Sequence, residues 1–211
     1  MKRLTPEFAE IIGLLCAEGC HIYRYEDFME LDKGRIRFHY NHKSERIEFY
    51  NKDVKLLLHL KELLDKEFGY RPNITKNGKI NICRKDIIQE IIKQTELGHL
   101  KWKVPEPIMT GDDDIKISFL RGYFDGDGTV SNRVRMFSTN MSGLMQVSKI
   151  LEELAIKYTF PKPIIKKNRK PLYYIQISEK EKERFLNIIK PSSKIRPTIA
   201  RVAKPGQMRR T

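Results

Sequence analysis

The sequence predicts a mixed α/β (α+β) protein built from two pseudo-symmetric units, each with the order helix, hairpin, helix, hairpin, helix. Two observations lead to this prediction. Two capped, largely apolar helices with matching small residues recur in the two halves of the chain, and each is followed by the same succession of alternating strands and amphipathic helices. The chain has 211 residues, of which 40% are hydrophobic, so it can fill the core of both units.

The first helix of each unit is marked at its ends. In residues 5–20, Thr5 suits the N-cap and Pro6 the first helical position. In residues 112–129, three aspartates at positions 112–114 favour the positive end of a helix dipole, and Gly126 is typical of the other end. Both segments are therefore predicted to be helices with defined starts and stops.

Small residues occupy equivalent positions in these two helices. They recur every four residues and so lie on one face, where another backbone can approach closely. We expect the two helices to pack together along this stripe. The equivalent pairs are Ala9 with Ser118, Gly13 with Gly122, and Ala17 with Gly126.

An acidic residue follows the stripe in each helix, at Glu18 and Asp127. If the helices pack side by side, both carboxylates reach the same end of the pair. That arrangement is unfavourable by itself, because each acid faces the negative end of a helix dipole and the two charges repel. A bound divalent cation would offset both effects, so the pair predicts a metal site.

Basic strands follow each motif helix. Residues 22–25, 35–40 and 46–51 alternate with a period of two, as do residues 133–136 in the second unit. We expect Ile36, Phe38, Val134 and Met136 to face the helices and the basic side chains to face outward toward a nucleic acid. The basic residues predicted to bind are Arg24, Arg35, Arg37, His39, Lys43, Arg46, Lys76, Lys79, Arg133, Arg135, Lys166, Lys167, Arg169 and Lys170.

The rest of each unit repeats the same order. Amphipathic helices are expected at 52–69 and 140–156, hairpins at 74–82 and 163–177, and closing helices at 86–94 and 181–190. The segment 26–34 has no counterpart in the second unit. These elements divide the chain into a first unit at 1–100, a linker at 101–111, a second unit at 112–191 and a basic tail at 192–211.

The excess of basic residues indicates what kind of partner the protein binds. Lys and Arg number 41 against 27 Asp and Glu, and a net charge of +14 favours a polyanionic partner. No apolar run is long enough to span a membrane, and the first residues lack the apolar core of a signal peptide. The three cysteines fit packing positions in a reducing compartment better than a disulfide framework, so an intracellular protein is expected.

Other binding motifs are excluded by spacing. An EF-hand counted from Asp125 would place its glycine at Val130 and its glutamate at Met136. A phosphate-binding loop would need a Gly-Lys-Ser/Thr ending, which is absent. Cys16, Cys20 and His21 have no matching pair at zinc-finger spacing.

The ends of the two helices, IIGLLCAEGC and FLRGYFDGDGTV, resemble the paired motifs of the LAGLIDADG homing endonuclease family. The resemblance covers nearly the whole chain, in the family's monomeric two-motif form of archaeal introns and inteins. It implies saddle-shaped antiparallel sheets lying in the DNA major groove, with cleavage of both strands beside the packed helices.

The resemblance also implies roles for individual residues. By position, Glu18 and Asp127 match the acidic metal ligands, with the carbonyls of Ala17 and Gly126 close by. The first motif departs from the commonest family pattern in having Glu for Asp, although both bind Mg²⁺ through oxygen. The family's polar residue and lysine at the end of the second strand match Asn51 and Lys52 in the first unit. The second unit offers Thr139 and Asn140, with an alignment uncertain by one residue and no lysine.

These features predict a monomeric, site-specific endonuclease that uses Mg²⁺ or Mn²⁺ to hydrolyse both strands of a long, non-palindromic double-stranded DNA site. Ca²⁺ is expected to support binding with little cleavage. The alternative is a binding protein on the same fold, either an RNA maturase for a host intron or a DNA-binding regulator without cleavage.

Overall fold

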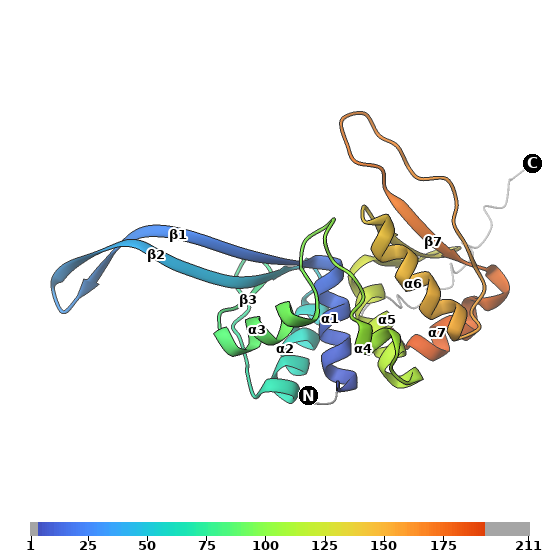
Figure 1. The fold of residues 1–211 in the computed structure, drawn as a ribbon, viewed down its shortest axis with the longest axis horizontal. Helices are drawn as coiled ribbons and strands as arrows, with labels where there is room; N and C mark the ends of the chain where they lie inside the picture. Colours follow the sequence, from blue (N-terminus) through green and yellow to red (C-terminus); the bar gives the residue numbers. More distant parts are fainter. Residues whose placement is uncertain (1–3, 193–211) are drawn as a thin grey trace, which may run out of the picture.

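The computed structural model describes residues 4–192, except for the side chains at 26, 28, 41 and 42. The basic tail expected from residue 192 onward therefore lies outside the described residues, apart from Ser192. The motif helices, the sheets and the helices that cover them all fall within the described part (Figure 1).

The two units have the predicted succession of elements. The first contains α1 (Pro6–Glu18), β1 (Gly19–Asp32), β2 (Arg35–Tyr50), α2 (Val54–Phe68), β3 (Lys79–Ile82) and α3 (Lys85–Gln94). The second contains α5 (Asp113–Asp127), β4 (Gly128–Val130), β5 (Val134–Ser138), α6 (Met141–Glu153), β6 (Tyr158–Thr159), β7 (Tyr173–Ile177), a 3₁₀ turn η1 (Glu179–Glu181) and α7 (Lys182–Ile189). The short helix α4 (Glu106–Met109) lies between the units.

Each unit contains an antiparallel sheet that packs on helices through one face. The strand order is β1-β2-β3 in the first sheet and β4-β5-β7-β6 in the second. Apolar side chains of the central strands, such as Ile47, Phe49, Val134 and Met136, are buried against the helices. The predicted α+β class and its repeated order are confirmed.

The contact between α1 and α5 joins the two units (Figure 1). A methyl group on Gly13 would overlap the carbonyl oxygen of Phe119, and one on Gly122 would overlap the carbonyl oxygen of Glu10. The two backbones thus touch along the predicted stripe of small residues. This close approach confirms the expected packing of the motif helices.

A buried ionic cluster crosses the same contact. The Glu10 carboxylate, on α1, is 4% exposed and accepts a hydrogen bond of 3.0 Å from Arg121 on α5. It also contacts the His59 ring on α2. Arg121 donates a further bond of 2.6 Å to the carbonyl of Ile189 at the end of α7. A charge with several partners can be buried at an acceptable cost, and this one links both units.

The first hairpin is longer than predicted. The strands expected at 35–40 and 46–51 are one strand, β2, and β1 continues into the segment 26–34 as far as Asp32. Lys33 and Gly34 have φ values of 49° and 80°, as in the tight turns that join twisted strands. The ribbon extends beyond the helices (Figure 1), so the expectation that Ile36 and Phe38 face the helices is wrong: they are 63% and 58% exposed.

The later hairpins are also irregular. In the first unit, Ile74 and Ile80 form a single antiparallel β-bridge on either side of the predicted turn at Gly78. In the second unit the predicted hairpin at 163–177 forms only one bridge, between Ile164 and Leu172. Instead, β7 lies between β5 and β6 in the sheet, and residues 160–172 form a loop that projects from the sheet (Figure 1).

The segment between the units is packed rather than loose. The Trp102 side chain is buried, and a methyl group on Gly143 of α6 would overlap its ring. The Thr95 hydroxyl donates a hydrogen bond of 2.8 Å to the carbonyl of Lys103. The Val104 amide donates one of 2.9 Å to the Gln146 side chain. The predicted linker is therefore part of the core.

Two of the three cysteines do not pack as expected. Cys16 is buried, and burial raises the pKa of its thiol, whereas Cys20 and Cys83 are exposed.

None of the helices in the described part of the chain has both the length and the apolar character of a membrane-spanning helix.

Candidate active site and nucleic-acid interface

The two motif helices end side by side at their acidic residues. Helix α1 ends at Glu18 and α5 at Asp127, and a strand begins at the next residue in each unit. A methyl group on Gly126 would overlap the Ala17 side chain and lie 3.5 Å from Cγ of Glu18. The last turn of α5 therefore packs on the last turn of α1, and the Glu18 side chain passes beside the residue that precedes Asp127.

A cavity opens at this end of the helix pair. It has a volume of about 190 Å³ and contains Asp127, together with side chains from both units and from the segment between them. Burial raises the pKa of the Tyr123 phenol well above its usual value, and the negative charge of Asp127 contributes a smaller rise. The cavity is lined by Ala17, His99, Trp102, Asp127, Phe137, Ser138, Thr139 and Leu172.

The helix caps indicate which residues of the two units correspond at the ends of their second strands. Asp53 caps α2 and Asn140 caps α6. The Asp53 amide donates a hydrogen bond of 2.9 Å to the Asn51 side chain, and the Asn140 amide donates one of 3.0 Å to the Ser138 hydroxyl. Asn51 thus corresponds to Ser138, and Lys52 corresponds to Thr139. These matching bonds support one of the two alignments that the sequence leaves open.

This alignment gives Asn140 a different role from the one expected. Its side chain is buried, its carbonyl oxygen accepts a hydrogen bond of 3.1 Å from the Gly143 amide, and its amide nitrogen donates one of 2.7 Å to the Trp102 carbonyl. These bonds cap α6 and hold the inter-unit segment. In this structure the Asn140 side chain caps α6 and is not among the residues that line the cavity. Ser138, which is not among the residues predicted from the sequence, lines the cavity in its place.

The donor set suits a hard divalent cation. Glu18 and Asp127 provide carboxylate oxygens, and the last carbonyls of each helix, including those of Ala17 and Gly126, lie at the same end. Within residues 4–192, no cluster of three or more His, Cys, Asp or Glu side chains is arranged to hold a metal ion. A cation here would complete its coordination with water and phosphate oxygens, as Mg²⁺ commonly does.

Basic side chains line the outer face of the second sheet. Arg133 and Arg135 alternate with the buried Val134 and Met136, as predicted, and both donate hydrogen bonds to the Gln176 side chain. The Arg135 guanidinium also lies over the Tyr174 ring, 5.3 Å from its centre. These contacts hold the arginines on the side of the sheet that faces away from the helices.

Acidic partners accompany the basic residues of the first sheet. Glu48 accepts hydrogen bonds from Arg46 at 2.9 Å and Lys79 at 3.1 Å, and the Arg46 guanidinium in particular lowers the pKa of its carboxyl group. Farther along the hairpin, Arg37 pairs with Asp32 and His39 pairs with Glu30. The basic side chains are thus held in place by acids.

Lys43 lies on the other face of the hairpin. Lys43 is separated by an even number of positions along β2 from the buried Ile47 and Phe49, so its side chain lies on the same face as theirs. Its cross-strand partner is Tyr25. The Lys43 ammonium group lies over the Tyr23 ring, 4.6 Å from its centre. Lys43 therefore lies on the face of the hairpin opposite to that of Arg46.

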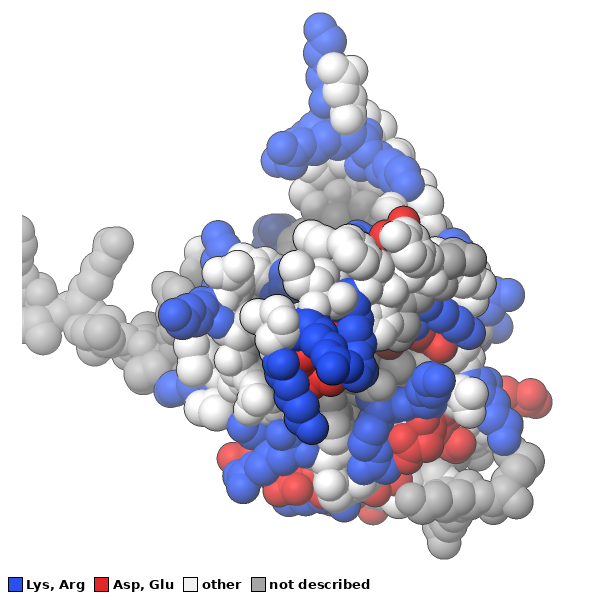
Figure 2. Space-filling view, turned by 90° about the vertical axis from the view of Figure 1, so that its left-hand side faces the viewer, with Lys and Arg blue, Asp and Glu red and all other residues white. Residues whose placement is uncertain are grey.

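The remaining predicted basic residues lie on exposed strand or loop positions. Arg24 and Arg35 are exposed on the hairpin, and Lys76 lies in the turn before β3. Lys166, Lys167, Arg169 and Lys170 lie on the projecting loop, which is covered with Lys and Arg at the top of Figure 2. Acidic side chains gather lower on the same view. The loop at the top is therefore the more basic part of this view.

A known family model matches part of the chain. Residues 114–190 match the model of the LAGLIDADG-like domain. DNA polymerases of Methanocaldococcus jannaschii and Thermococcus hydrothermalis are both 29% identical to the chain, over 166 and 163 residues that cover 72% and 73% of it. The chain spans only 9% of the length of each of these polymerases.

Solved structures show the same fold over most of the chain. A structure of mesophilic variants of the homing endonuclease I-DmoI has a TM-score of 0.62 at 18% identity, covering 87% of this chain and 94% of that one. I-DmoI in complex with DNA and Ca gives 0.62 at 18% identity, covering 89% and 91%. The N-terminal LAGLIDADG domain of DUF199/WhiA gives 0.53 at 17% identity, covering 90% and 86%.

Proposed function

We propose that this protein is a site-specific DNA endonuclease, because residues 114–190 match the model of the LAGLIDADG-like domain and the chain has the fold of the homing endonuclease I-DmoI. It would make a double-strand break in a long site of double-stranded DNA. The two units differ in sequence and in hairpin length, so the preferred site would not be palindromic. Such an enzyme acts on the DNA of its own cell, which implies an intracellular location.

The observation that carries this proposal is the meeting of two acidic residues where the units touch. Glu18 and Asp127 end helices whose backbones are in contact, and each unit contributes one acid and one sheet. A protein that only bound nucleic acid would gain nothing from paired carboxylates, because they repel phosphate. One chain supplies both acids, so it can act as a monomer.

Divalent metal fits the donor oxygens at this end of the helices. Mg²⁺ or Mn²⁺ held by Glu18 and Asp127 would activate water and stabilise charge on the phosphate and the leaving 3′ oxygen. Lys52, exposed just after β2, would neutralise charge on one phosphate. Asn51 and Thr139 would orient water beside it. Solved structures of I-DmoI with DNA and Ca and with DNA and Mn support the use of such ions.

Basic residues on the strands and loops would hold the DNA across both units. Arg133 and Arg135 are fixed by Gln176 and would reach base edges or phosphates from the second sheet. The hairpin β1-β2 and the loop 160–172 would extend the contact in two directions. The match to a small part of much longer DNA polymerases fits an endonuclease inserted in a host gene, as homing implies.

The proposal is tested by cleavage of DNA that carries the host site without the insertion. A plasmid with the flanking sequences joined, incubated with the protein and Mg²⁺, should be cut at one place in both strands. EDTA should abolish cutting, and Ca²⁺ should retain binding with little turnover. A protein that binds this DNA or the intron RNA but cuts neither strand with Mg²⁺ or Mn²⁺ would be the maturase or regulator instead.

A further inference from the structure

The two halves of the candidate site differ in positive charge. Lys52 follows β2 in the first unit, whereas the corresponding residue after β5 is Thr139, which has no charge. Each unit of the proposed enzyme would act on one DNA strand. The Asp127 side would therefore lack the cation that Lys52 provides on the Glu18 side.

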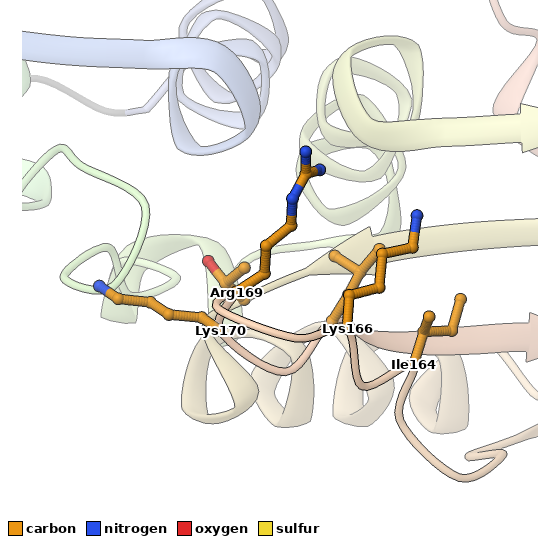
Figure 3. A pocket seen from close by; sticks show the side chains of 6 residues that line it. Ile164, Lys166, Arg169 and Lys170 are labelled. Carbon is orange, nitrogen blue, oxygen red and sulfur yellow. The ribbon is translucent and has the colours of Figure 1, made fainter.

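A lysine from a different part of the chain lies beside Thr139. Lys170, on the loop 160–172, lines a pocket of about 230 Å³ with Thr139 and Leu172. These last two residues also line the cavity that contains Asp127, so the two spaces adjoin. Figure 3 shows the loop residues around this pocket, with Lys170 extending away from Lys166 and Arg169.

His99 fixes the position of this lysine. The Lys170 ammonium group donates a hydrogen bond of 3.1 Å to Nε2 of His99, which lies between α3 and α4. The Thr139 hydroxyl donates one of 3.0 Å to the His99 carbonyl. His99 also lines the cavity around Asp127. The three residues thus form one connected group at the edge of the candidate active site.

We propose that Lys170, held by His99, takes the place of the missing lysine in the Asp127 half of the site and contacts the phosphate that is cut there. This inference rests on the proposed endonuclease function. Lys170 would be the charge-stabilising group and His99 a positioning residue. The loop that carries Lys170 belongs to the second unit, so the two halves would reach equivalent chemistry through different elements.

The chemical role requires no proton transfer by Lys170. Hydrolysis forms a bond between the water oxygen and phosphorus and breaks the bond between phosphorus and the 3′ oxygen. The proton lost by water passes to solvent, and the 3′ oxygen takes a proton from solvent and leaves as a hydroxyl group. A fixed ammonium group near the phosphate stabilises the negative charge that grows during this step.

The pocket offers a matched control on the same loop. Lys167 has the same charge as Lys170 and does not line the pocket. A Lys167→Met variant removes one positive charge from the loop and leaves the contact with His99 in place. It therefore separates general attraction of DNA from action at the site.

Strand-resolved cleavage tests the proposal. In a duplex labelled differently on each strand, Lys170→Met should slow cutting of one strand by about 100-fold, the size of effect seen for removal of one stabilising donor. Lys52→Met should slow the other strand, and nicked product should accumulate in both cases. His99→Ala should slow the same strand as Lys170→Met, and Lys170→Arg should recover part of the rate. Lys167→Met should leave the ratio of the two strands unchanged.

A binding measurement supplies an independent readout. In Ca²⁺, Lys170→Met should weaken binding of the natural duplex by about 10-fold, the loss that removal of a charge-assisted contact causes. A duplex with a neutral methylphosphonate at the phosphate cut in the Asp127 half should bind the wild type and this variant equally. Equal slowing of both strands, or weakening that persists with the neutral duplex, would overturn the inference. A wild-type protein that cuts neither strand would contradict the proposed function instead.

Discussion

At the scale of single residues, the carboxylates were predictable because their signal is local and occurs twice. Glu18 and Asp127 follow the same stripe of small residues in both halves, so spacing alone brings them to one end of a helix pair. The pairing of Lys170 with His99 could not be predicted, because the two residues are 71 positions apart. Their contact depends on how the inter-unit segment packs on the second unit.

Asn140 illustrates the opposite case, in which a local pattern allows two interpretations. A polar residue between a strand and a helix can hold solvent or cap the helix, and in the sequence both roles look alike. The structure favours the cap, since the Asn140 amide bonds to Gly143 and to Trp102. A shift of one residue in the alignment of the two units decides whether Asn140 corresponds to a solvent-binding residue or to a helix cap.

Asn140→Ala should therefore destabilise the fold. It removes the α6 cap and leaves the buried Trp102 carbonyl without this donor, at a cost of about 1–3 kcal/mol. Urea unfolding would measure the loss, with Asn132→Ala, an exposed turn position, as the control. A stability equal to that of the wild type would show that the cap contributes nothing.

At the scale of elements, the motif helices were predicted well and the first hairpin was not. The tight turn at Lys33 and Gly34 needs positive φ at both residues, and lysine does not mark such a position. A register shift between Glu26 and Phe28 also interrupts the alternation along the ribbon. Two ordinary signs of a long hairpin are therefore missing from the sequence. Ile36 and Phe38 are exposed because the long hairpin carries them beyond the helices.

Gly122→Ala should weaken the contact between the motif helices. The added methyl group overlaps the Glu10 carbonyl oxygen and lies 2.9 Å from the Leu14 amide nitrogen, so the helices must move apart. Overpacking of this kind costs about 1–3 kcal/mol. It should also reduce cleavage, because Glu18 and Asp127 separate with their helices.

The matched control for this variant is Asp114→Ala, at an exposed position of the same helix. Thermal unfolding and cleavage rates would be measured for both proteins. If Gly122→Ala leaves both quantities at wild-type values, then the close helix contact is not needed for stability or for the site.

At the scale of the whole molecule, the charge predicted the kind of partner but not how the charge is arranged. A net charge of +14 favours a polyanion. In the structure, acids such as Glu48 lie among the basic residues of the first sheet, and the most basic projection is the loop 160–172. Cross-strand pairing sets these contacts, and the composition does not reveal them.

DNA binding should therefore depend strongly on salt. Each phosphate that the protein neutralises contributes about −0.9 to the slope of log K against log salt concentration. Arg133→Ala should reduce the slope by about 1 if Arg133 contacts phosphate, and should instead relax specificity at one base pair if it contacts a base. Lys61→Ala, on α2 away from both sheets' outer faces, is the control. Binding that does not change with salt would contradict the interface.

The central claim is that Glu18 and Asp127 hold the metal that cleavage requires. Its most direct test is to measure DNA affinity and double-strand cleavage together for Glu18→Gln and Asp127→Asn. Removing the charge relieves repulsion of the phosphate, so both variants should bind the target as tightly as the wild type or more tightly, while double-strand cleavage falls by orders of magnitude. A wild type that cuts its site, with both variants cutting at the same rate, would contradict the claim.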